Sequence, residues 1–190
     1  MFNDRYITCG ARAFQESARP LFFTMNTMTK KILIAGIGNI ARMDDGIGVH
    51  VIRYINESND LNTECVETLE IGSAIYDLMP VMMGRRKVIL VDAIKANAPP
   101  GSVYSITSNN LSSDFWKLLG KSPELRSVLL QCYIASGEFD IDLIGIEPDR
   151  TDLCSMLLSE SVKKNIPVAA SEILKIISQF VKNNPEYIHE

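Results

Sequence analysis

Two short runs of apolar residues constrain the fold of this chain more than any other feature. The first, residues 31–36, reads KILIAG, and the second, residues 87–91, reads KVILV. Apolar runs of about 4–8 residues bounded by glycine or polar residues are typical of strands buried on both faces of a parallel sheet. Parallel neighbours need long crossover connections, which helices usually supply. We therefore expect strands that alternate with helices.

The rest of the chain carries the patterns of further strands and of helices that cover them. Apolar residues recur at helical spacing from Asp45 and again over 168–182, and residues 65–71 alternate as a strand does. Residues 99–101, PPG, form a turn, so residues 103–107 are expected to be an edge strand. The remaining expected elements are a last strand over 140–145 and helices over 73–83, 112–120, 123–132 and 159–165. This order predicts a single three-layer α/β domain, with a mostly parallel twisted sheet and helices on both faces.

Size, composition and charge suit one such domain. The chain has 190 residues, 46% of them hydrophobic and 22% charged, which is enough for one packed core and too little for two catalytic domains. The formal net charge of -4 offers no basic field, so we expect neither nucleic acid nor an anionic membrane as a partner. No apolar stretch approaches ~18 residues, so no membrane span is expected. The four cysteines form no close pairs, which favours reduced thiols in a cytoplasmic protein.

Both ends of the chain are expected to lie outside the domain, which we place at residues 30–182. Residues 1–29 combine charged residues with a short apolar patch, Leu21-Phe22-Phe23. That patch is shorter than the apolar region of a secretory signal, and the acidic residues argue against an organelle transit peptide. We interpret residues 1–29 as a loose arm or as the product of an upstream start codon, and residues 183–190 as a polar tail.

Glycines directly follow the first apolar strand, at the end of a sheet where α/β proteins bind ligands. Residues 36–41, GIGNIA, match the loose dinucleotide fingerprint G-x-G-x-x-G/A, and Glu67 or Glu70 has the position of a ribose-binding acid. Asp44 and Asp45 weaken this interpretation, because carboxylates in the first turn of the next helix repel phosphate. A nucleotide-binding oxidoreductase is the weaker alternative, which tight binding of NAD would support.

Acidic residues stand at the same end of the expected sheet. Asp92 directly follows the second apolar run, and Asp45 begins the helix after the first. Since the carboxyl ends of neighbouring parallel strands meet at one edge, we expect Asp45 and Asp92 at one rim, where both can bind one metal ion. The alternative for each is a buried carboxylate that is hydrogen-bonded to loop amides, because an unpaired buried acid costs stability. We interpret Asp44 as an N-cap of the helix.

Several short motifs follow one another in a fixed order along the chain. Residues 34–39 read IAGIGN, and residues 44–49 read DDGIGV. Further motifs are EIGS at 70–73, DA at 92–93 with PG at 100–101, LIGIEP at 143–148 and LSESV at 158–162. This series, over about residues 30 to 180, resembles that of the hydrogenase maturation endopeptidases: G-x-G-N, an acidic D-D/E-x-x-G helix start, a D-G-G-T-type segment, D-A…P-G, G-x-x-P-E and L-S-x-x-V. Several motifs in order are more specific than any one of them.

The resemblance implies a phosphorylase/hydrolase-like fold and an endopeptidase that acts as a monomer. Its implied substrate is the large-subunit precursor of a nickel–iron hydrogenase, from which it removes a C-terminal peptide. Nickel carried by the precursor, rather than held permanently, is the implied recognition element. The family's acid at the helix start and its Asp after the middle strand correspond to Asp45 and Asp92, which are thereby implied as catalytic and metal-binding residues. Its third ligand, the His of an S-x-H segment, aligns with Asp114.

Asp114 is a departure from the family pattern. Imidazole suits nickel, whereas three carboxylates suit harder ions. His50 does not replace the missing ligand, because it is turned roughly 140° from Asp45 around the expected helix, and His189 lies in the polar tail. The chain also has no paired Ser/His/Asp set and no H-E-x-x-H helix, so metal or carboxylate is expected to assist the attack of a water. A non-cleaving module that binds the same precursor is therefore the alternative.

Overall fold

A five-stranded sheet forms the centre of the computed structural model, which describes residues 32–58, 61, 64–107, 122–136 and 140–185. The strands are β1 (Ile32–Ile37), β2 (Val66–Gly72), β3 (Lys87–Ala93), β4 (Val103–Thr107) and β5 (Ile141–Ile146). Their order in the sheet is β2-β1-β3-β5-β4, and only β4 is antiparallel to its neighbour. The expected strands are confirmed, and so is the edge position of β4.

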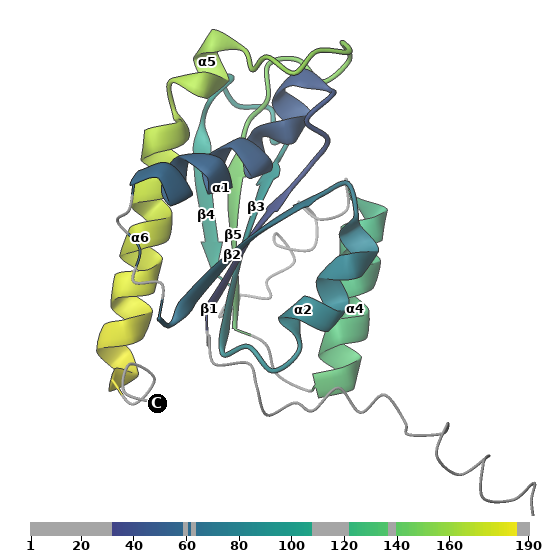
Figure 1. Ribbon diagram of the computed structural model, residues 1–190. Coiled ribbons are helices and arrows are strands. Elements are labelled where there is room, and N and C mark those ends of the chain that lie inside the picture. Colours follow the sequence, from purple (N-terminus) through teal and green to yellow (C-terminus); the bar gives the residue numbers. More distant parts are fainter. Residues whose placement is uncertain (1–31, 59–60, 62–63, 108–121, 137–139, 186–190) are drawn as a thin grey trace, which may run out of the picture.

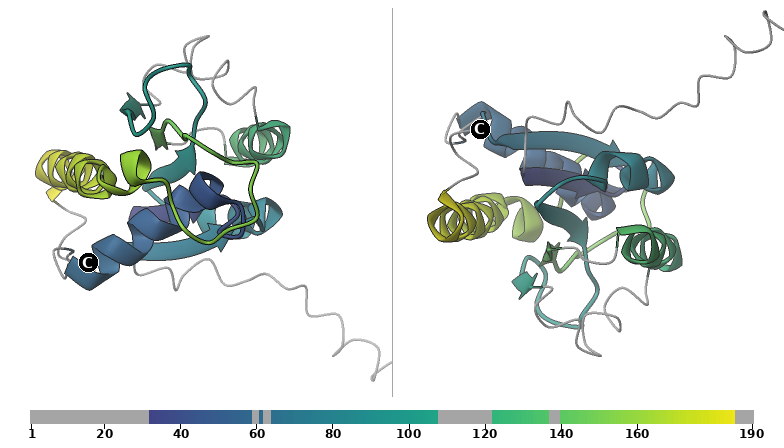
Figure 2. Two further views of the ribbon diagram at one scale, coloured as in Figure 1. Left: turned by 90° about the horizontal axis from the view of Figure 1, so that it is seen from above. Right: turned by 90° about the horizontal axis from the view of Figure 1, so that it is seen from below.

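Helices cover both faces of this sheet (Figure 1). They are α1 (Ile47–Ser58), α2 (Leu78–Met82), α4 (Pro123–Ser136), α5 (Glu160–Lys163) and α6 (Ile166–Asn183). Successive side chains of β1 point to opposite faces, so Ile32 and Ile34 pack with residues of α1 and α6, whereas Leu33 and Ala35 pack with residues of α2 and α4. Figure 2 shows the strands end-on between these two pairs of helices. The predicted three-layer α/β domain is confirmed.

The helix expected from Asp45 begins differently. A 3-10 turn, η1 (Met43–Gly46), precedes α1, and no side chain caps it. The interpretation of Asp44 as an N-cap is therefore wrong. Its carboxylate is instead fully buried. It accepts hydrogen bonds from Asp149 and Ser159, in the loop between β5 and α5.

The helix expected over 73–83 is also shorter than predicted. It consists of a 3-10 turn, η2 (Ile75–Asp77), followed by α2, and Ala74 occupies the N-cap position of η2. Apolar spacing located this segment correctly, but a proline at position 80 and a short connection to β3 leave room for little more than one α-helical turn.

Other expectations concern residues outside the described ranges. These are the arm over 1–29, the helix over 112–120 and the last residues of the tail. Of the three described cysteines, Cys65 and Cys132 are buried, Cys154 is exposed, and none forms a disulfide. Among the described helices, none combines the length and the apolar character that crossing a membrane requires.

Candidate active site

Asp45 and Asp92 line one cleft at the carboxyl end of the parallel strands. Asp45 lies in η1 and Asp92 near the end of β3. The pairing of β1 with β3 aligns Gly36 with Val91, so the segments that follow these two residues emerge at the same edge. The structure thus brings together the two acids that the sequence pointed to. The third, Asp114, lies outside the described residues.

Two glycines bring these acids close to each other. Gly38 has a φ of 113°, and a Cβ at this position would overlap the carbonyl oxygen of Asp45. Gly48, in the first turn of α1, lies so near the sheet that a Cβ would overlap the carbonyl oxygens of Ile37 and Val91. Only glycine leaves room for such contacts. The glycines of G-x-G-N and D-D-G-I-G therefore set the distance between the start of α1 and the end of β3.

A turn beside β1 fixes the orientation of Asp45. The side-chain oxygen of Asn39 accepts a hydrogen bond of 2.9 Å from the backbone N–H of Ala41, which closes the turn. The backbone N–H of Asn39 then donates a 3.1 Å hydrogen bond to Oδ2 of Asp45. Sequence reasoning did not assign a role to Asn39, although its place in the G-x-G-N motif marked it as part of a tight turn.

Asp92 is a carboxylate in an unfavourable place for its negative charge. Its side chain is half-buried, and Oδ1 accepts a 2.8 Å hydrogen bond from the N–H of Ala93. Burial outweighs this hydrogen bond and, together with the negative charge of Asp45, raises the pKa of Asp92 to about 7. Such a group exchanges a proton near neutral pH and gains from any cation that enters the cleft.

The cleft has two lobes that share Asp45 and Asp92. The smaller, about 240 Å³, has apolar walls from Ile94, Leu125, Leu143 and Pro148 and a polar side formed by Lys95, Ser122 and Thr151. The larger, about 400 Å³, is more polar and is lined by Asn39, Arg42, Ser73, Ser122 and Glu124 among others. Nζ of Lys95 donates a 2.9 Å hydrogen bond to Thr151 across the rim of the smaller lobe. The two lobes thus differ in polarity and share the acidic pair.

Glu147, which follows β5, organises the loop after Asp92. Its carboxylate accepts hydrogen bonds from the hydroxyl of Tyr104 at 2.6 Å, the N–H of Ala96 at 2.7 Å and the N–H of Asn97 at 3.3 Å. Burial alone would raise the pKa of Glu147, but these donors outweigh it, so the pKa is lowered and the group stays ionised. One clue in the sequence was not used: Glu147 directly follows a buried strand, β5, much as Asp92 follows the apolar run of β3.

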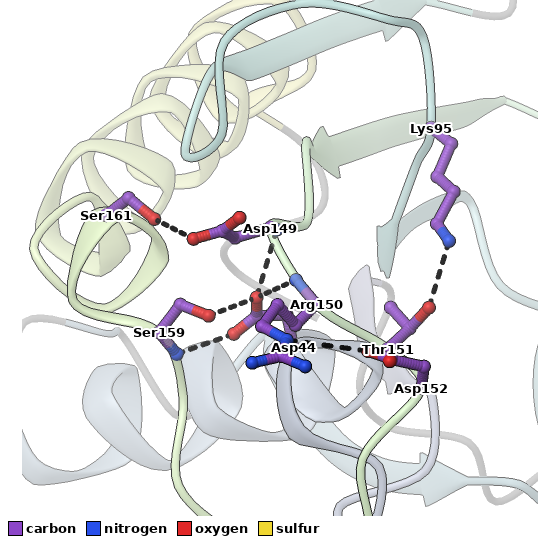
Figure 3. Close-up of polar contacts among 8 residues, drawn as sticks. All are labelled: Asp44, Lys95, Asp149, Arg150, Thr151, Asp152, Ser159 and Ser161. Carbon is purple, nitrogen blue, oxygen red and sulfur yellow. Dashed lines mark hydrogen bonds and ion pairs between the residues drawn. The ribbon is translucent and has the colours of Figure 1, made fainter.

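Asp44 ties the loop between β5 and α5 to η1 (Figure 3). The carboxylate is 0% exposed. Its oxygens accept hydrogen bonds from the N–H groups of Asp149 and Arg150 and from both the N–H and the hydroxyl of Ser159, at 2.7–3.0 Å. Asp44 is therefore a structural residue, bonded to loop groups in the way that the sequence suggested as an alternative for Asp45 and Asp92, not for Asp44.

The acids proposed for a ribose contact have other partners. Glu70 forms a bidentate ion pair with Arg53, the shortest contact being 2.8 Å, and Glu67 pairs with Arg85 at 2.6 Å. His50 lines neither lobe of the acidic cleft. Burial, with a smaller effect from Arg53, lowers its pKa, and its Nε2 has no hydrogen-bond partner among the described residues. The ion pairs of Glu67 and Glu70 give both carboxylates a partner within the protein, so neither needs a bound nucleotide.

The fold and the acidic cleft at its strand ends define an α/β protein with the architecture of a maturation endopeptidase. The structure is similar to that of the hydrogenase maturating endopeptidase HybD from E. coli, with a TM-score of 0.65 and 26% identity over 78% of this chain and 93% of that one. It also shares its fold with the [NiFe] hydrogenase maturation protease HybD from Thermococcus kodakarensis, with a TM-score of 0.63 and 24% identity over 77% and 98% of the two chains.

Sequence comparison gives the same result. The model of the hydrogenase maturation protease family matches residues 49–176, which is more than half of the chain. The Hydrogenase 2 maturation protease of Escherichia coli (strain K12) is 27% identical over 153 residues, which cover 78% of this chain and 92% of that protein. Protein FrxA of Pyrococcus furiosus is 30% identical over 147 residues, which cover 72% and 97%. The chain therefore belongs to the hydrogenase maturation protease family, as its motifs predicted.

Proposed function

We propose that this protein is an endopeptidase that removes a C-terminal peptide from the nickel-loaded large-subunit precursor of a nickel–iron hydrogenase, and that it acts as a monomer in the cytoplasm. The observation that carries the proposal is the convergence of Asp45 and Asp92 in one cleft. Membership of the hydrogenase maturation protease family supports the reaction class.

In this proposal nickel reaches the cleft as part of the substrate. Asp45 and Asp92 offer carboxylate oxygens, which suit a divalent cation but supply only part of a coordination sphere. Among the described residues, no group of three or more His, Cys, Asp and Glu is arranged to hold a metal ion. The proposed arrangement therefore keeps the precursor's own ligands on the nickel, with Asp114 as the proposed third ligand from this chain.

The raised pKa of Asp92 gives a reason why the protein would bind the metal-loaded precursor in preference to the metal-free one. Without a cation, the charged form of Asp92 is disfavoured by burial and by Asp45. A divalent cation between the two carboxylates removes that repulsion, so binding is strongest for a precursor that carries the metal.

The peptide bond to be cut would lie beside this acidic pair. Asp45 is held in place by the N–H of Asn39 and so positions the metal-bearing segment. Bound metal supplies a Lewis acid that polarises the scissile carbonyl or a water. A carboxylate oxygen of Asp45 or Asp92 that does not bind the metal would accept a proton from the attacking water and return it to the peptide nitrogen as the C–N bond breaks. The walls of the two lobes hold the chain on either side of the cut.

The test is a processing assay with purified protein and nickel-loaded large-subunit precursor, in which mass spectrometry follows the C-terminus. We expect the precursor to lose its C-terminal peptide only when nickel is present. Asp45→Asn and Asp92→Asn should each abolish cleavage, because they remove charge and keep shape. Glu172→Gln is the matched control, since Glu172 is an acid of α6 whose partner is Lys175, and it should leave cleavage unchanged.

Three outcomes would contradict this function. Normal processing by Asp45→Asn and Asp92→Asn would remove the acidic pair from the reaction. Binding of the precursor without any loss of mass would support the non-cleaving binding module, which the departure at Asp114 suggests. Tight binding of NAD by the purified protein would point to a nucleotide site instead.

A further inference from the structure

The loop between β5 and α5, residues 149–159, is fixed to the rest of the protein at both of its ends. The buried carboxylate of Asp44 accepts hydrogen bonds from the N–H groups of Asp149 and Arg150 at one end. At the other end it accepts them from the N–H and hydroxyl of Ser159, both at 2.7 Å. Figure 3 shows these contacts converging on one side chain. One buried charge thus closes the loop into a fixed shape.

The middle of the 149–159 loop is attached as well. The N–H of Met43 donates a 2.8 Å hydrogen bond to the carbonyl oxygen of Ser155, and the N–H of Ser155 donates one of 3.0 Å to the carbonyl oxygen of Ala41. The loop therefore runs beside residues 41–43, which directly precede Asp44 and Asp45. In the view from above in Figure 2, this stretch of chain passes over the end of the sheet near α1.

Large apolar side chains project from this fixed loop into solvent. Leu153 is 41% exposed, Met156 62% and Leu157 76%. Single exposed apolar residues are common on protein surfaces, but several on one short segment mark interaction sites. A loosely held loop can fold such side chains inward, whereas this loop is held by Asp44 and by Ser155. Its fixed shape also lowers the entropy lost when a partner binds.

The loop is continuous with the acidic cleft. Thr151 from the loop, and Pro148 just before it, line the smaller lobe together with Asp45 and Asp92. A folded protein that delivers its C-terminus to these acids is far larger than the cleft and must cover the rim around it. On this side the rim includes Thr151, and the exposed Leu153, Met156 and Leu157 follow it in the same loop.

We propose that the 149–159 loop is the docking surface for the folded body of the hydrogenase large-subunit precursor, which contacts Leu153, Met156 and Leu157 through an apolar patch of its own. This inference rests on the proposed function and adds the place where the partner is held. Affinity for the precursor then comes mainly from the loop, whereas Asp45 and Asp92 act on the peptide bond.

The test compares Leu157→Asp with Ile134→Asp. Ile134 is a matched control, because it is an apolar residue 81% exposed on α4, outside the residues that line the cleft. We expect Leu157→Asp to raise the Kd for nickel-loaded precursor, and the KM of processing, by ~10-fold or more with little change in kcat. Ile134→Asp should leave both constants unchanged. Circular dichroism and Tm of the variants show whether each is folded, and Met156→Ser provides a milder second variant.

The results separate this inference from the proposed function. If Asp45→Asn stops cleavage while Leu157→Asp and Met156→Ser bind the precursor as tightly as the natural protein does, the docking surface is wrong and the endopeptidase stands. If the natural protein binds but does not cut, and Leu157→Asp weakens binding, the docking surface stands and the endopeptidase is wrong. If sedimentation shows a dimer that Leu157→Asp dissociates, a second copy of this chain covers the loop, which overturns the proposal.

Discussion

Asp44 and Asp45 are neighbours in the chain, but their carboxylates contact different segments. The carboxylate of Asp44 is buried against Asp149, Arg150 and Ser159, more than 100 residues away in sequence. The carboxylate of Asp45 accepts a hydrogen bond from Asn39 and lines the cleft with Asp92. Both residues lie in the 3-10 turn η1, from which their side chains extend to different parts of the protein. One acid therefore contributes to the folded structure and the other faces the cleft.

This separation predicts opposite effects of two substitutions. Asp44→Ala removes a fully buried acceptor and leaves four donors without their partner, so the free energy of unfolding should fall by ~3 kcal/mol or more. Asp45→Asn keeps the shape of a half-buried side chain and should change stability by less than ~1 kcal/mol while it abolishes processing. Urea denaturation measures the first quantity and the processing assay the second. Equal stability of Asp44→Ala and the natural protein would contradict the buried network.

The distance between α1 and the end of β3 gives a second prediction. Gly48→Ala places a Cβ against the carbonyl oxygens of Ile37 and Val91, so α1 must move away from the sheet. We expect a loss of several kcal/mol of stability, which thermal denaturation detects. Because Asp45 precedes α1 and Asp92 follows Val91, any folded fraction should also process the precursor poorly.

Gly84→Ala is the control for this substitution. Gly84 has a positive φ of 78°, which Gly48 does not, and a Cβ there meets nothing within 4 Å. Its replacement should cost about 1 kcal/mol through backbone strain alone and leave processing intact. If both substitutions have the same effect, close packing at Gly48 does not hold the two acids together.

The sequence predicted Asp45 and Asp92 because their positions depend on local rules. Asp92 follows the second apolar run, Asp45 stands at the start of the helix after the first, and parallel pairing brings the ends of such strands together. Asp44 was misread because its partners lie in a loop that no local pattern connects to it. The same holds for Glu147, whose partners on β4 and in the loop after β3 become neighbours only when β5 pairs with both strands. Tertiary contacts of this kind override the capping preference of an Asp before a helix.

A third prediction concerns Asp92 and the pH dependence of stability. Its pKa is raised from 3.8 to about 7 in the folded protein, so between these values the folded state binds more protons than the unfolded state. Stability must then fall as pH rises from about 4 to about 7. Asp92→Asn removes this loss, so its free energy of unfolding should exceed that of the natural protein at pH 8, by up to ~4 kcal/mol, and the two should converge near pH 4.

Denaturant titrations of both proteins at pH 4, 6 and 8 measure this difference. Asp140→Asn, which alters an acid that pairs with Lys87 near the amino end of β3, controls for a general effect of lost charge. If the free energies of unfolding of the natural protein and of Asp92→Asn differ by the same amount at every pH, the pKa of Asp92 is not raised in the folded protein. Higher stability combined with lost processing would identify Asp92 as a residue kept for function rather than for folding.

The last prediction has the opposite sign, because the pKa of Glu147 is lowered by Tyr104 and the backbone N–H groups despite its burial. A lowered carboxyl pKa contributes stability that is present above the unfolded pKa, near 4.5, and is lost as pH falls through the folded value. Tyr104→Phe removes the 2.6 Å hydrogen bond from the hydroxyl and keeps the ring. We expect it to lower the free energy of unfolding by ~1–3 kcal/mol at pH 7, and by less at pH 3.

Glu147→Gln should be at least as destabilising as Tyr104→Phe at pH 7, since it removes the negative charge and its amide nitrogen would face either the N–H of Asn97 or the N–H of Ala96 and the Tyr104 hydroxyl. Combined in one protein, the two changes should cost less than their sum, because both remove the charge-assisted hydrogen bond between Tyr104 and Glu147. Denaturation of the four proteins at both pH values completes the cycle. Additive effects would show that Tyr104 and Glu147 stabilise the protein independently. Coupling between them would instead explain how a buried acid at the end of β5 holds the loop that follows Asp92.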